Sequence, residues 1–277
     1  MSPDALYNGA RVEPAEWSRS RGLHYGDGVF RTLYIHEGEC IDWPGQRAHL
    51  LADAARLGLS LPAAAAQSLD AEVRTIARER TAAVLKILLW RQSSSGRGYA
   101  PAAAHAERLL LCSPAPEHPA ACWTHGVRVI DSPVRLASPH LLAGAKHLNR
   151  LEQVLASREW PAGIDEALMS DADGHVVCGT RSNLFWSRHG RLLTPSVERC
   201  GVAGRMRARV LELAARQGLE IAIRLAPRAE LEVADELFLT NSVFGIWPVR
   251  RYGAHDLQAP GPLTQALMRQ LHHPRMP

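Results

Sequence analysis

The chain has 277 residues, which is enough to bury a large core and favours two domains over one. Hydrophobic residues make up 46% of the chain and charged residues 22%, as in ordinary globular proteins. The net charge of +4 is mild and no basic run contains interleaved aromatics, so nucleic acid is not an expected partner, whereas a small anionic substrate is compatible with this charge.

The first 112 residues predict short strands and two amphipathic helices. The strand segments are rich in Val, Leu and Ile, and the helical segments repeat apolar residues every three or four positions. Glycines frame tight loops at 26–28 and at 92–101. The predicted strands span residues 6–11, 28–37, 83–91 and 108–112, and the predicted helices span 46–57 and 68–80.

Residues 113–121, SPAPEHPAA, contain three prolines and show no hydrophobic periodicity. This composition is typical of a linker between domains. We therefore predict a smaller N-terminal α/β domain at 1–112 and a larger C-terminal domain at 122–277.

The larger domain is expected to be built on antiparallel hairpins. Turn residues at 171–174 and at 188–190 each separate two β-rich segments, as in hairpins. No GxGxxG or P-loop motif is present, so the sequence predicts an α+β fold and not a Rossmann or TIM arrangement. Further strands are predicted at 126–131, 219–224 and 236–241, and helices at 201–218, 227–233 and 263–271.

Lys146 stands just before an amphipathic segment in which Leu148, Leu151, Val154 and Leu155 recur at helical spacing. We expect a helix there with its apolar face on the core. The partial positive charge of a helix N-terminus would lower the pKa of the lysine and favour a neutral, nucleophilic amine. The alternative is a solvated lysine before a surface helix, and this stretch alone favours that alternative.

Two segments could bind an anion. Gly201-Val202-Ala203-Gly204 precedes a predicted helix, so its amides could hold a phosphate with help from the helix dipole. Thr240-Asn241-Ser242 ends a predicted strand and offers hydroxyl and amide groups. Each segment could also be a plain joint or turn. Together they would suit a phosphorylated cofactor anchored by Lys146.

Arg97 lies in a glycine-framed loop and could grip a substrate carboxylate, because guanidinium matches that anion bidentately. The alternative is a solvated loop arginine. The five cysteines are scattered without metal-ligand spacing, so we predict neither a metal site nor a disulfide framework. With no signal segment and no bilayer-length apolar run, a cytoplasmic protein without a membrane partner is expected.

Several segments together resemble the aminodeoxychorismate lyase family. This family belongs to the fold-type IV group of enzymes that use pyridoxal 5'-phosphate (PLP), which also holds branched-chain and D-amino-acid aminotransferases. The resemblance implies a D-amino-acid aminotransferase-like fold, PLP as cofactor, and a homodimer with its active site near the subunit contact. The segments are YGDGVF at 25–30, SGRGYAP at 95–101, KHLNRLEQVLA at 146–156, GTRSNLFW at 179–186, TPSVERCGVAGRMR at 194–207 and FLTNSVFGIWPVR at 238–250.

The resemblance assigns roles to individual positions. Lys146 matches the lysine that forms the Schiff base with PLP and moves the substrate proton, and Thr32 matches a hydroxyl that assists proton transfer. Arg97 matches the arginine that faces the substrate carboxylate, and Asn149 matches a contact to the cofactor ring oxygen. The positions that match phosphate contacts are Val202, Ala203, Asn241 and Ser242.

Two cofactor-binding positions depart from the family pattern. Cys178 stands where the wider group has a glutamate that pairs with the pyridine nitrogen, and His49 stands where it has a phosphate-binding arginine, a role that Arg47 could take over. A thiol with an ordinary pKa of about 8.5 is largely neutral at pH 7 and cannot keep that nitrogen protonated. Transamination should suffer most from this change.

The resemblance therefore implies a lyase that converts aminodeoxychorismate to para-aminobenzoate and pyruvate in folate biosynthesis. Expulsion of pyruvate creates an aromatic ring, so a weaker electron sink suffices for this reaction. One alternative is a class IV aminotransferase acting on small amino acids, against which Cys178 argues. Another is a PLP-free relative with a binding role, against which the intact Lys146 and phosphate segments argue.

Overall fold

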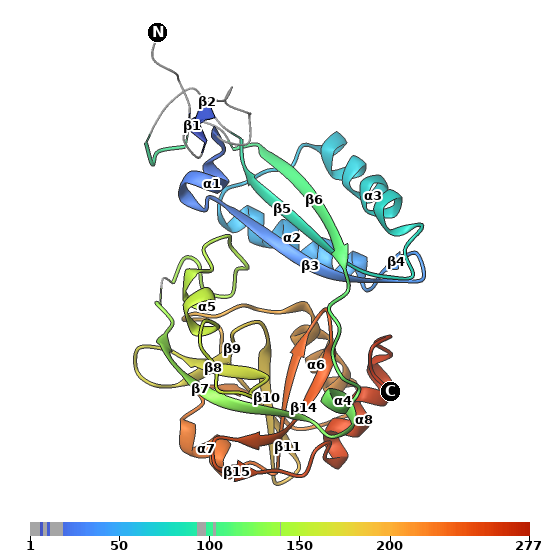
Figure 1. The fold of residues 1–277 in the computed structure, drawn as a ribbon, viewed down its shortest axis with the longest axis vertical. Coiled ribbons are helices and arrows are strands. Elements are labelled where there is room, and N and C mark those ends of the chain that lie inside the picture. Colours follow the sequence, from blue (N-terminus) through green and yellow to red (C-terminus); the bar gives the residue numbers. More distant parts are fainter. Residues whose placement is uncertain (1–5, 8–9, 12–18, 93–97, 102–103, 139) are drawn as a thin grey trace.

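The structure is a computed structural model that describes residues 6–7, 10–11, 19–92, 98–101, 104–138 and 140–277. Its strands form a small pair, a four-stranded sheet and a nine-stranded sheet. Figure 1 shows the four-stranded sheet above the larger one, with a single connection running from β6 into the larger body. The small pair consists of β1 (Leu6–Tyr7) and β2 (Ala10–Arg11).

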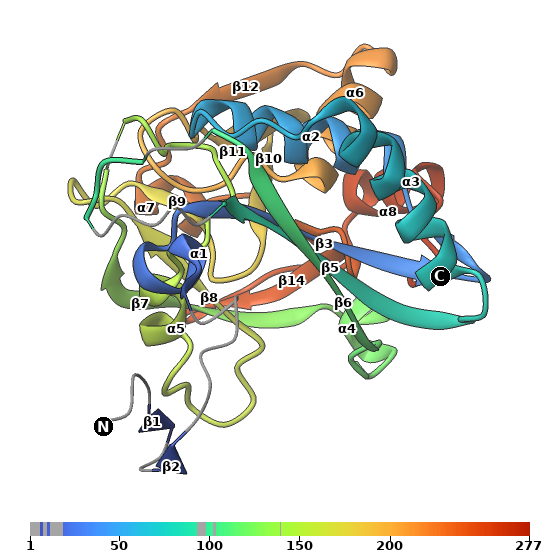
Figure 2. The ribbon, with the colours of Figure 1, turned by 90° about the horizontal axis from the view of Figure 1, so that it is seen from above.

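The four-stranded sheet has the antiparallel order β4-β3-β5-β6. Helices α2 and α3 cover one of its faces (Figure 2) and bury alternate residues of β3, including Val29, Leu33 and Ile35. Its elements are α1 (Arg21–Tyr25), β3 (Gly28–His36), β4 (Glu39–Cys40), α2 (Trp43–Arg56), α3 (Ala63–Ala77), β5 (Ala82–Arg91) and β6 (Ala106–Pro114).

The larger sheet closes into a ring. Strands β10, β13, β14, β7, β8 and β9 follow one another, and β9 pairs back onto β10 through Cys178 and Asn183. The strands are β7 (Val127–Arg135), β8 (Glu166–Ser170), β9 (Val176–Gly179), β10 (Asn183–Arg188), β11 (Arg191–Pro195), β12 (Ile221–Arg224), β13 (Glu236–Asn241), β14 (Gly245–Tyr252) and β15 (His255–Asp256). The helices are α4 (Ala121–Thr124), α5 (Leu151–Ala156), α6 (Arg205–Arg216), α7 (Arg228–Glu232) and α8 (Pro262–Leu271).

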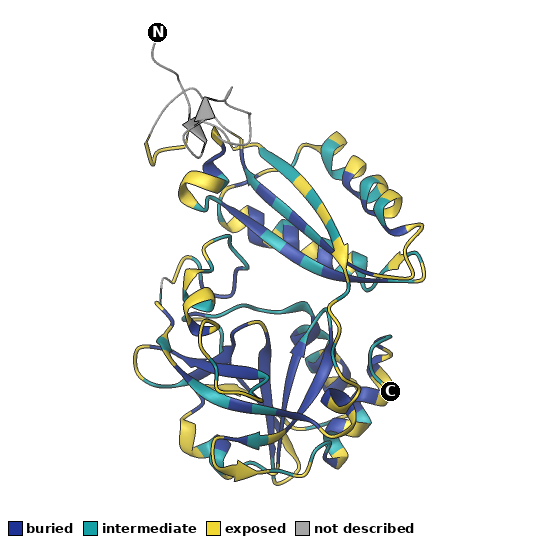
Figure 3. Cartoon of the chain, in the orientation of Figure 1, coloured by how far each residue is buried: buried dark blue, intermediate teal, exposed yellow. Residues whose placement is uncertain are grey.

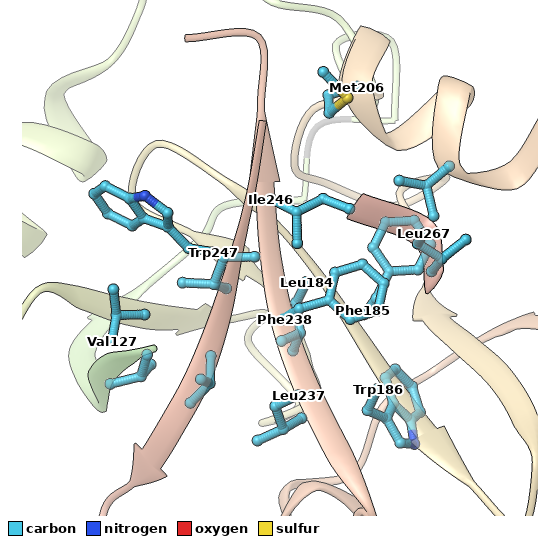
Figure 4. Close-up of a cluster of buried hydrophobic side chains, with 14 of the residues drawn as sticks. Val127, Leu184, Phe185, Trp186, Met206, Leu237, Phe238, Ile246, Trp247 and Leu267 are labelled. Atoms are coloured by element: carbon cyan, nitrogen blue, oxygen red, sulfur yellow. The ribbon is translucent and has the colours of Figure 1, made fainter. Parts of the chain in front are cut away.

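An apolar core fills the space between the larger sheet and helices α6 and α8. Figure 4 shows its centre, where the rings of Phe185 and Phe238 stack with centroids 5.0 Å apart. Trp186 and Ile246 are also almost fully buried. Packing in this core fixes the positions of β10 and β13, whose ends at Asn183 and Asn241 lie near the candidate site described below.

The predicted hairpins are confirmed, since β8 pairs with β9 and β10 with β11, both antiparallel. The sheet is nevertheless mixed, because β7 runs parallel to both β8 and β14 and β11 runs parallel to β12. Helix α3 begins at Ala63, earlier than predicted, because the alanine run before Ser68 is strongly helix-forming. Strand β14 was not predicted.

The predicted helix after Lys146 is wrong in position and in packing. Helix α5 begins only at Leu151 and has six residues. Its apolar side chains Leu151, Val154 and Leu155 are 68%, 61% and 47% exposed, and Figure 3 shows much of α5 in contact with solvent. Hydrophobic spacing identified an apolar face, but it does not say what covers that face.

The chain between Pro114 and Ala121 is the connection between the two larger sheets. We propose on this basis that the domains are 1–112 and 122–277, with 113–121 as the linker, although β6 extends two residues into that segment. No helix in the described part of the chain has the length and apolar character needed to cross a membrane.

Candidate active site

A cavity of about 820 Å³ lies between the two sheets. Phe30 and Thr32 on β3 and Gln46 on α2 line it from the N-terminal side. Lys146 and the start of α6 line it from the other side. Both halves of the chain are therefore needed to form it.

Lys146 is fixed by both of its main-chain groups. Its N–H donates to Asp53 Oδ2 at 3.0 Å, and its carbonyl oxygen accepts a hydrogen bond of 2.9 Å from the N–H of Phe30. Its Nζ lies 4.8 Å from the centroid of the Phe30 ring, as does Nζ of Lys86. The amine thus opens into the cavity from a backbone held by β3 and α2.

The pKa of Lys146 is lowered from 10.5 to about 8. Removal from bulk water is the largest cause, followed by the positive charges of Arg31 and Arg150, while the Asp53 carboxylate opposes the shift. The predicted direction is confirmed, but the predicted cause is wrong, because α5 begins five residues later. A substantial fraction of the amine is neutral near pH 8.

Asp53 organises this region from the inner face of α2. Its carboxylate forms a buried ion pair with Arg31 of β3 as well as bonding the Lys146 N–H. Neither Asp53 nor Arg31 was predicted as a site residue. A charged residue on the same helical face as Leu50 and Ala54 was the signal in the sequence that could have revealed Asp53.

The loop before α6 lines the cavity with Gly201, Val202 and Gly204. Asn183 holds this loop in place, because its Nδ2 donates to the Val202 carbonyl at 2.8 Å. The Ala203 N–H donates to the Gly144 carbonyl at 2.8 Å and is therefore not free for a ligand. This placement differs from the predicted phosphate contact at Ala203.

The end of β13 brings three polar residues to the cavity. Ser242 Oγ accepts a hydrogen bond of 2.6 Å from Gln46 Nε2, so its own O–H remains available as a donor. The side-chain oxygen of Asn241 instead accepts the amides of Val243 and Phe244, at 2.9 and 2.8 Å. Asn241 therefore shapes the turn and is not free to contact a phosphate through that oxygen.

Cys178 lies on the cavity wall, in one row with Asn183 and Thr240 across β9, β10 and β13. Residues directly opposite one another on neighbouring strands point to the same face, which explains why all three line the cavity. Burial, with a smaller effect of Cys200, raises the pKa of Cys178 to about 12. Its thiol is therefore neutral at pH 7.

Glu166 does not replace the carboxylate that Cys178 lacks. It is fully buried on β8 and accepts hydrogen bonds from the side chains of Thr180 and Ser182, at 2.5 and 3.0 Å. Amides of Thr180 and Ala167 bond it as well. Its oxygens organise the 179–182 loop from behind the cavity wall.

The remaining predicted residues are placed differently. Thr32 lines the cavity, whereas His49 lies beside the Ala203 backbone and outside the lining. Asn149 is exposed and its Nδ2 donates to the Gly26 carbonyl at 3.3 Å, so it holds α1 and does not face the cavity. Arg47 pairs with Asp70 at 3.0 Å. Arg97 lies outside the described residues.

Arg150 lines the cavity, although the predicted contact was its neighbour Asn149. Its guanidinium contacts the ring nitrogen of His147. Its Nε is buried and has no hydrogen-bond partner among the described residues. Arg150 thus adds a positive charge to the wall that carries Lys146 and Cys178.

Residues 28–252 match the protein family described as amino-transferase class IV. The chain belongs to this family. The crystal structure of 4-amino-4-deoxychorismate lyase from Pseudomonas aeruginosa resembles it with a TM-score of 0.87 and 44% identity, covering 94% of this chain and 96% of that chain. The predicted α+β, fold-type IV class is confirmed by this likeness.

Two further relatives are similar to this chain over most of its length. Aminodeoxychorismate lyase of Vibrio harveyi is 31% identical over 255 residues, covering 90% of this chain and 92% of the relative. A branched-chain amino acid aminotransferase from T.th., whose crystal structure holds pyridoxamine 5'-phosphate, is 25% identical with a TM-score of 0.79. That likeness covers 94% of this chain and 90% of the aminotransferase.

The described residues also include one acidic cluster away from the cavity. Asp171, Asp173 and His175 lie close enough together to hold an ion, at the turn of the β8–β9 hairpin. Arg199 pairs with both carboxylates, at 3.7 and 2.6 Å. Arg199 offsets part of their charge, and the Asp171 carboxylate also accepts the amides of Asp173 and His175, so these contacts account for the cluster as a structural feature of the turn.

Proposed function

We propose that this protein is a PLP-dependent aminodeoxychorismate lyase that produces para-aminobenzoate and pyruvate in folate biosynthesis. The observation that carries the proposal is Lys146, whose amine has a lowered pKa and opens into the cavity between the two sheets. The similarity to named aminodeoxychorismate lyases over at least nine-tenths of the chain supports this choice of reaction.

The residues present fit PLP. The cavity offers an amine for the cofactor aldehyde at Lys146 and anion-binding groups at Val202 and Ser242. Thr240 Oγ1 is buried on the cavity wall and, among the described residues, has no hydrogen-bond partner. A buried hydroxyl without a partner is unfavourable, so it indicates a ligand that completes its hydrogen bonding.

When bound, PLP supplies an electron sink for the carbanion that forms at the substrate. Lys146 holds and transfers the proton, because a pKa of about 8 lets its Nζ gain or lose one near neutral pH. The Phe30 ring covers the Nζ from one side and limits its contact with water. Thr32 lines the same side and offers a hydroxyl to the proton path.

Cys178 favours the lyase reaction over transamination. Its neutral thiol cannot keep the ring nitrogen of PLP protonated, which weakens the electron sink. Loss of pyruvate from aminodeoxychorismate creates an aromatic ring and therefore needs a weaker sink. We also propose that Arg97 binds a substrate carboxylate, as its place in the family motif suggests.

A Lys146→Ala variant tests the proposal. We expect the purified wild-type protein to show the visible absorbance of lysine-bound PLP and to release para-aminobenzoate from aminodeoxychorismate. The variant should lose that band and at least about 1,000-fold of the activity, because nucleophile and proton carrier are removed together. Full lyase activity in the variant, or no PLP uptake by the wild type, would refute the proposal.

A class IV aminotransferase remains the second candidate, because the chain also resembles a branched-chain amino acid aminotransferase over most of its length. Incubation of the PLP-loaded protein with small amino acids distinguishes the two. Rapid conversion of the cofactor to its amine form, measured by absorbance, would favour the aminotransferase. A protein that stays colourless after PLP is added would instead indicate a PLP-free binding role.

We further propose a cytoplasmic homodimer. All five cysteines are free, which fits a reducing compartment. Leu23 on α1 and Leu151 and Leu155 on α5 are exposed apolar residues. The segments that carry them are joined by the bond from Asn149 to the Gly26 carbonyl, and exposed apolar residues of this kind are suited to contact with a second copy of the chain.

A further inference from the structure

Arg205 is a cation of the cavity that the family pattern does not explain. It is the first residue of α6, directly after Gly204 and three residues after Val202. It lines the cavity, and its side chain is 15% exposed. A positive charge at the start of a twelve-residue helix adds to the attraction that the helix itself has for an anion.

Two carboxylates fix the orientation of this guanidinium. Asp42 Oδ2 accepts from Arg205 Nε at 2.6 Å, and Glu212 Oε1 accepts from Nη1 at 2.6 Å. The remaining Nη2 lies 3.5 Å from Asp42 Oδ1, at the limit of a hydrogen bond, so its N–H groups are available to another acceptor. The arginine is thus held on one side and open on the other.

Asp42 makes this contact from an unfavourable backbone conformation. It occupies the N-cap position of α2 with φ of 56°, a left-handed conformation that is unfavourable for a residue with a side chain. Its carboxylate makes no capping hydrogen bond to α2 and binds Arg205 instead. The strain is consistent with a functional requirement for the orientation of Arg205.

The other two candidate cations are not available. His49 is half-buried outside the cavity lining, and burial together with the charges of Arg31 and Arg205 lowers its pKa, so its ring is neutral at pH 7. Arg47 lies outside the cavity lining and pairs with Asp70 on α3 at 3.0 Å. Neither residue can replace the arginine that the family has at position 49.

The neighbouring groups complete an anion site. Gln46, also on α2, donates a hydrogen bond to Ser242 Oγ. The O–H of Ser242 is therefore available to donate to a ligand in the cavity. Thr240 is 1% exposed, lines the cavity and has a hydroxyl with no partner among the described residues. These hydroxyls and the open Nη2 of Arg205 together offer several hydrogen-bond donors, one of them on a cation, and a phosphate can accept from all of them.

We propose that Arg205, held by Asp42, is the cation that binds the phosphate of PLP in this chain. The inference rests on the proposed PLP-dependent function and deepens it. It moves the phosphate-binding charge from the first helix of the N-terminal half to the start of α6, while α2 keeps a supporting role through Asp42 and Gln46.

The test compares PLP with pyridoxal, which has the same aldehyde but no phosphate. Dissociation constants are measured by absorbance on cofactor-free wild-type protein and on the Arg205→Met and Arg47→Met variants. We expect Arg205→Met to weaken PLP binding by about 10- to 100-fold, the effect of one charge-assisted contact, and to leave pyridoxal binding within about twofold. Arg47→Met should change neither constant.

Unchanged PLP affinity in Arg205→Met would overturn the inference, as would equal losses for PLP and pyridoxal in a folded variant. Adding His49→Arg to Arg205→Met should restore PLP affinity, since it returns a cation to the family position. If circular dichroism shows that Arg205→Met is unfolded, Arg205→Lys takes its place, with a smaller but still phosphate-specific loss expected. Failure of the wild type to bind either compound would refute the proposed function instead.

Discussion

The reactive amine of Lys146 depends on charges brought together by folding and not on its place in the sequence. Arg31 and Arg150 disfavour the ammonium form, and the Asp53 carboxylate, which also bonds the Lys146 N–H, opposes them. Because Asp53 pairs with Arg31, one buried ion pair both fixes the backbone of the lysine and adjusts its pKa. The position of Lys146 and the pKa of its amine thus both depend on the ion pair of Asp53 with Arg31.

The pH dependence of cofactor attachment follows from this pKa. Only the neutral amine attacks an aldehyde, and its fraction falls as pH drops below the pKa of about 8. The rate of PLP uptake by cofactor-free protein should therefore rise about tenfold per pH unit below that value and level off above it. Stopped-flow absorbance measures this rate. A rate that still rises at about pH 10 would show that the pKa of Lys146 has the ordinary value for lysine and would contradict this prediction.

The motif positions could be predicted from the sequence because each lies in a short segment of recognisable pattern. Lys146, Thr32, Val202 and Ser242 were predicted in this way, and all four line the cavity. Asp53, Gln46, Arg150 and Arg205 were not predicted, because neither the residue pattern nor the resemblance assigned a role to them. Their roles depend on contacts between distant segments, such as that of Asp42 with Arg205, 163 positions apart.

Among the elements, the segment around α5 shows the limit of periodicity. Its spacing correctly marks an apolar face, yet that face is exposed and the helix has only six residues. The hairpins were easier to predict, because turn residues fix them locally. The parallel pairing of β7 with β8 and β14 joins distant segments and leaves no local signal.

The exposed face of α5 predicts the assembly state. A Leu151→Lys, Leu155→Lys double variant should dissociate the proposed homodimer, because it places charges in an apolar contact. Since both side chains are exposed, the unfolding temperature of the monomer should change by less than about 3 °C. Sedimentation velocity measures the assembly. The control is Val233→Lys, an exposed apolar residue just after α7, which should remain dimeric.

In the whole molecule, the cavity joins two halves that the chain connects only through the linker. Contacts that cross it include Asp42 with Arg205, Gln46 with Ser242, and Asp53 with the Lys146 N–H. A ligand in the cavity touches both halves at once. Its binding energy therefore also stabilises their arrangement.

PLP should consequently stabilise the folded protein strongly. A ligand present at about 100 times its dissociation constant adds roughly 2.7 kcal/mol, which corresponds to an increase in unfolding temperature of about 5–10 °C for a chain of this size. Differential scanning calorimetry with and without PLP measures the shift. Unfolding temperatures that do not depend on PLP would contradict a site shared by both halves.

The closure of the larger sheet at Cys178 and Asn183 has a consequence for how this enzyme can diverge. Strands pair through main-chain atoms, whatever side chain the residue carries. Replacement of the thiol by another small side chain therefore leaves the ring of strands intact while changing the wall that faces the reaction. Natural variation among small side chains at position 178 can therefore change the chemistry of the cavity wall while the pairing of β9 with β10 is kept.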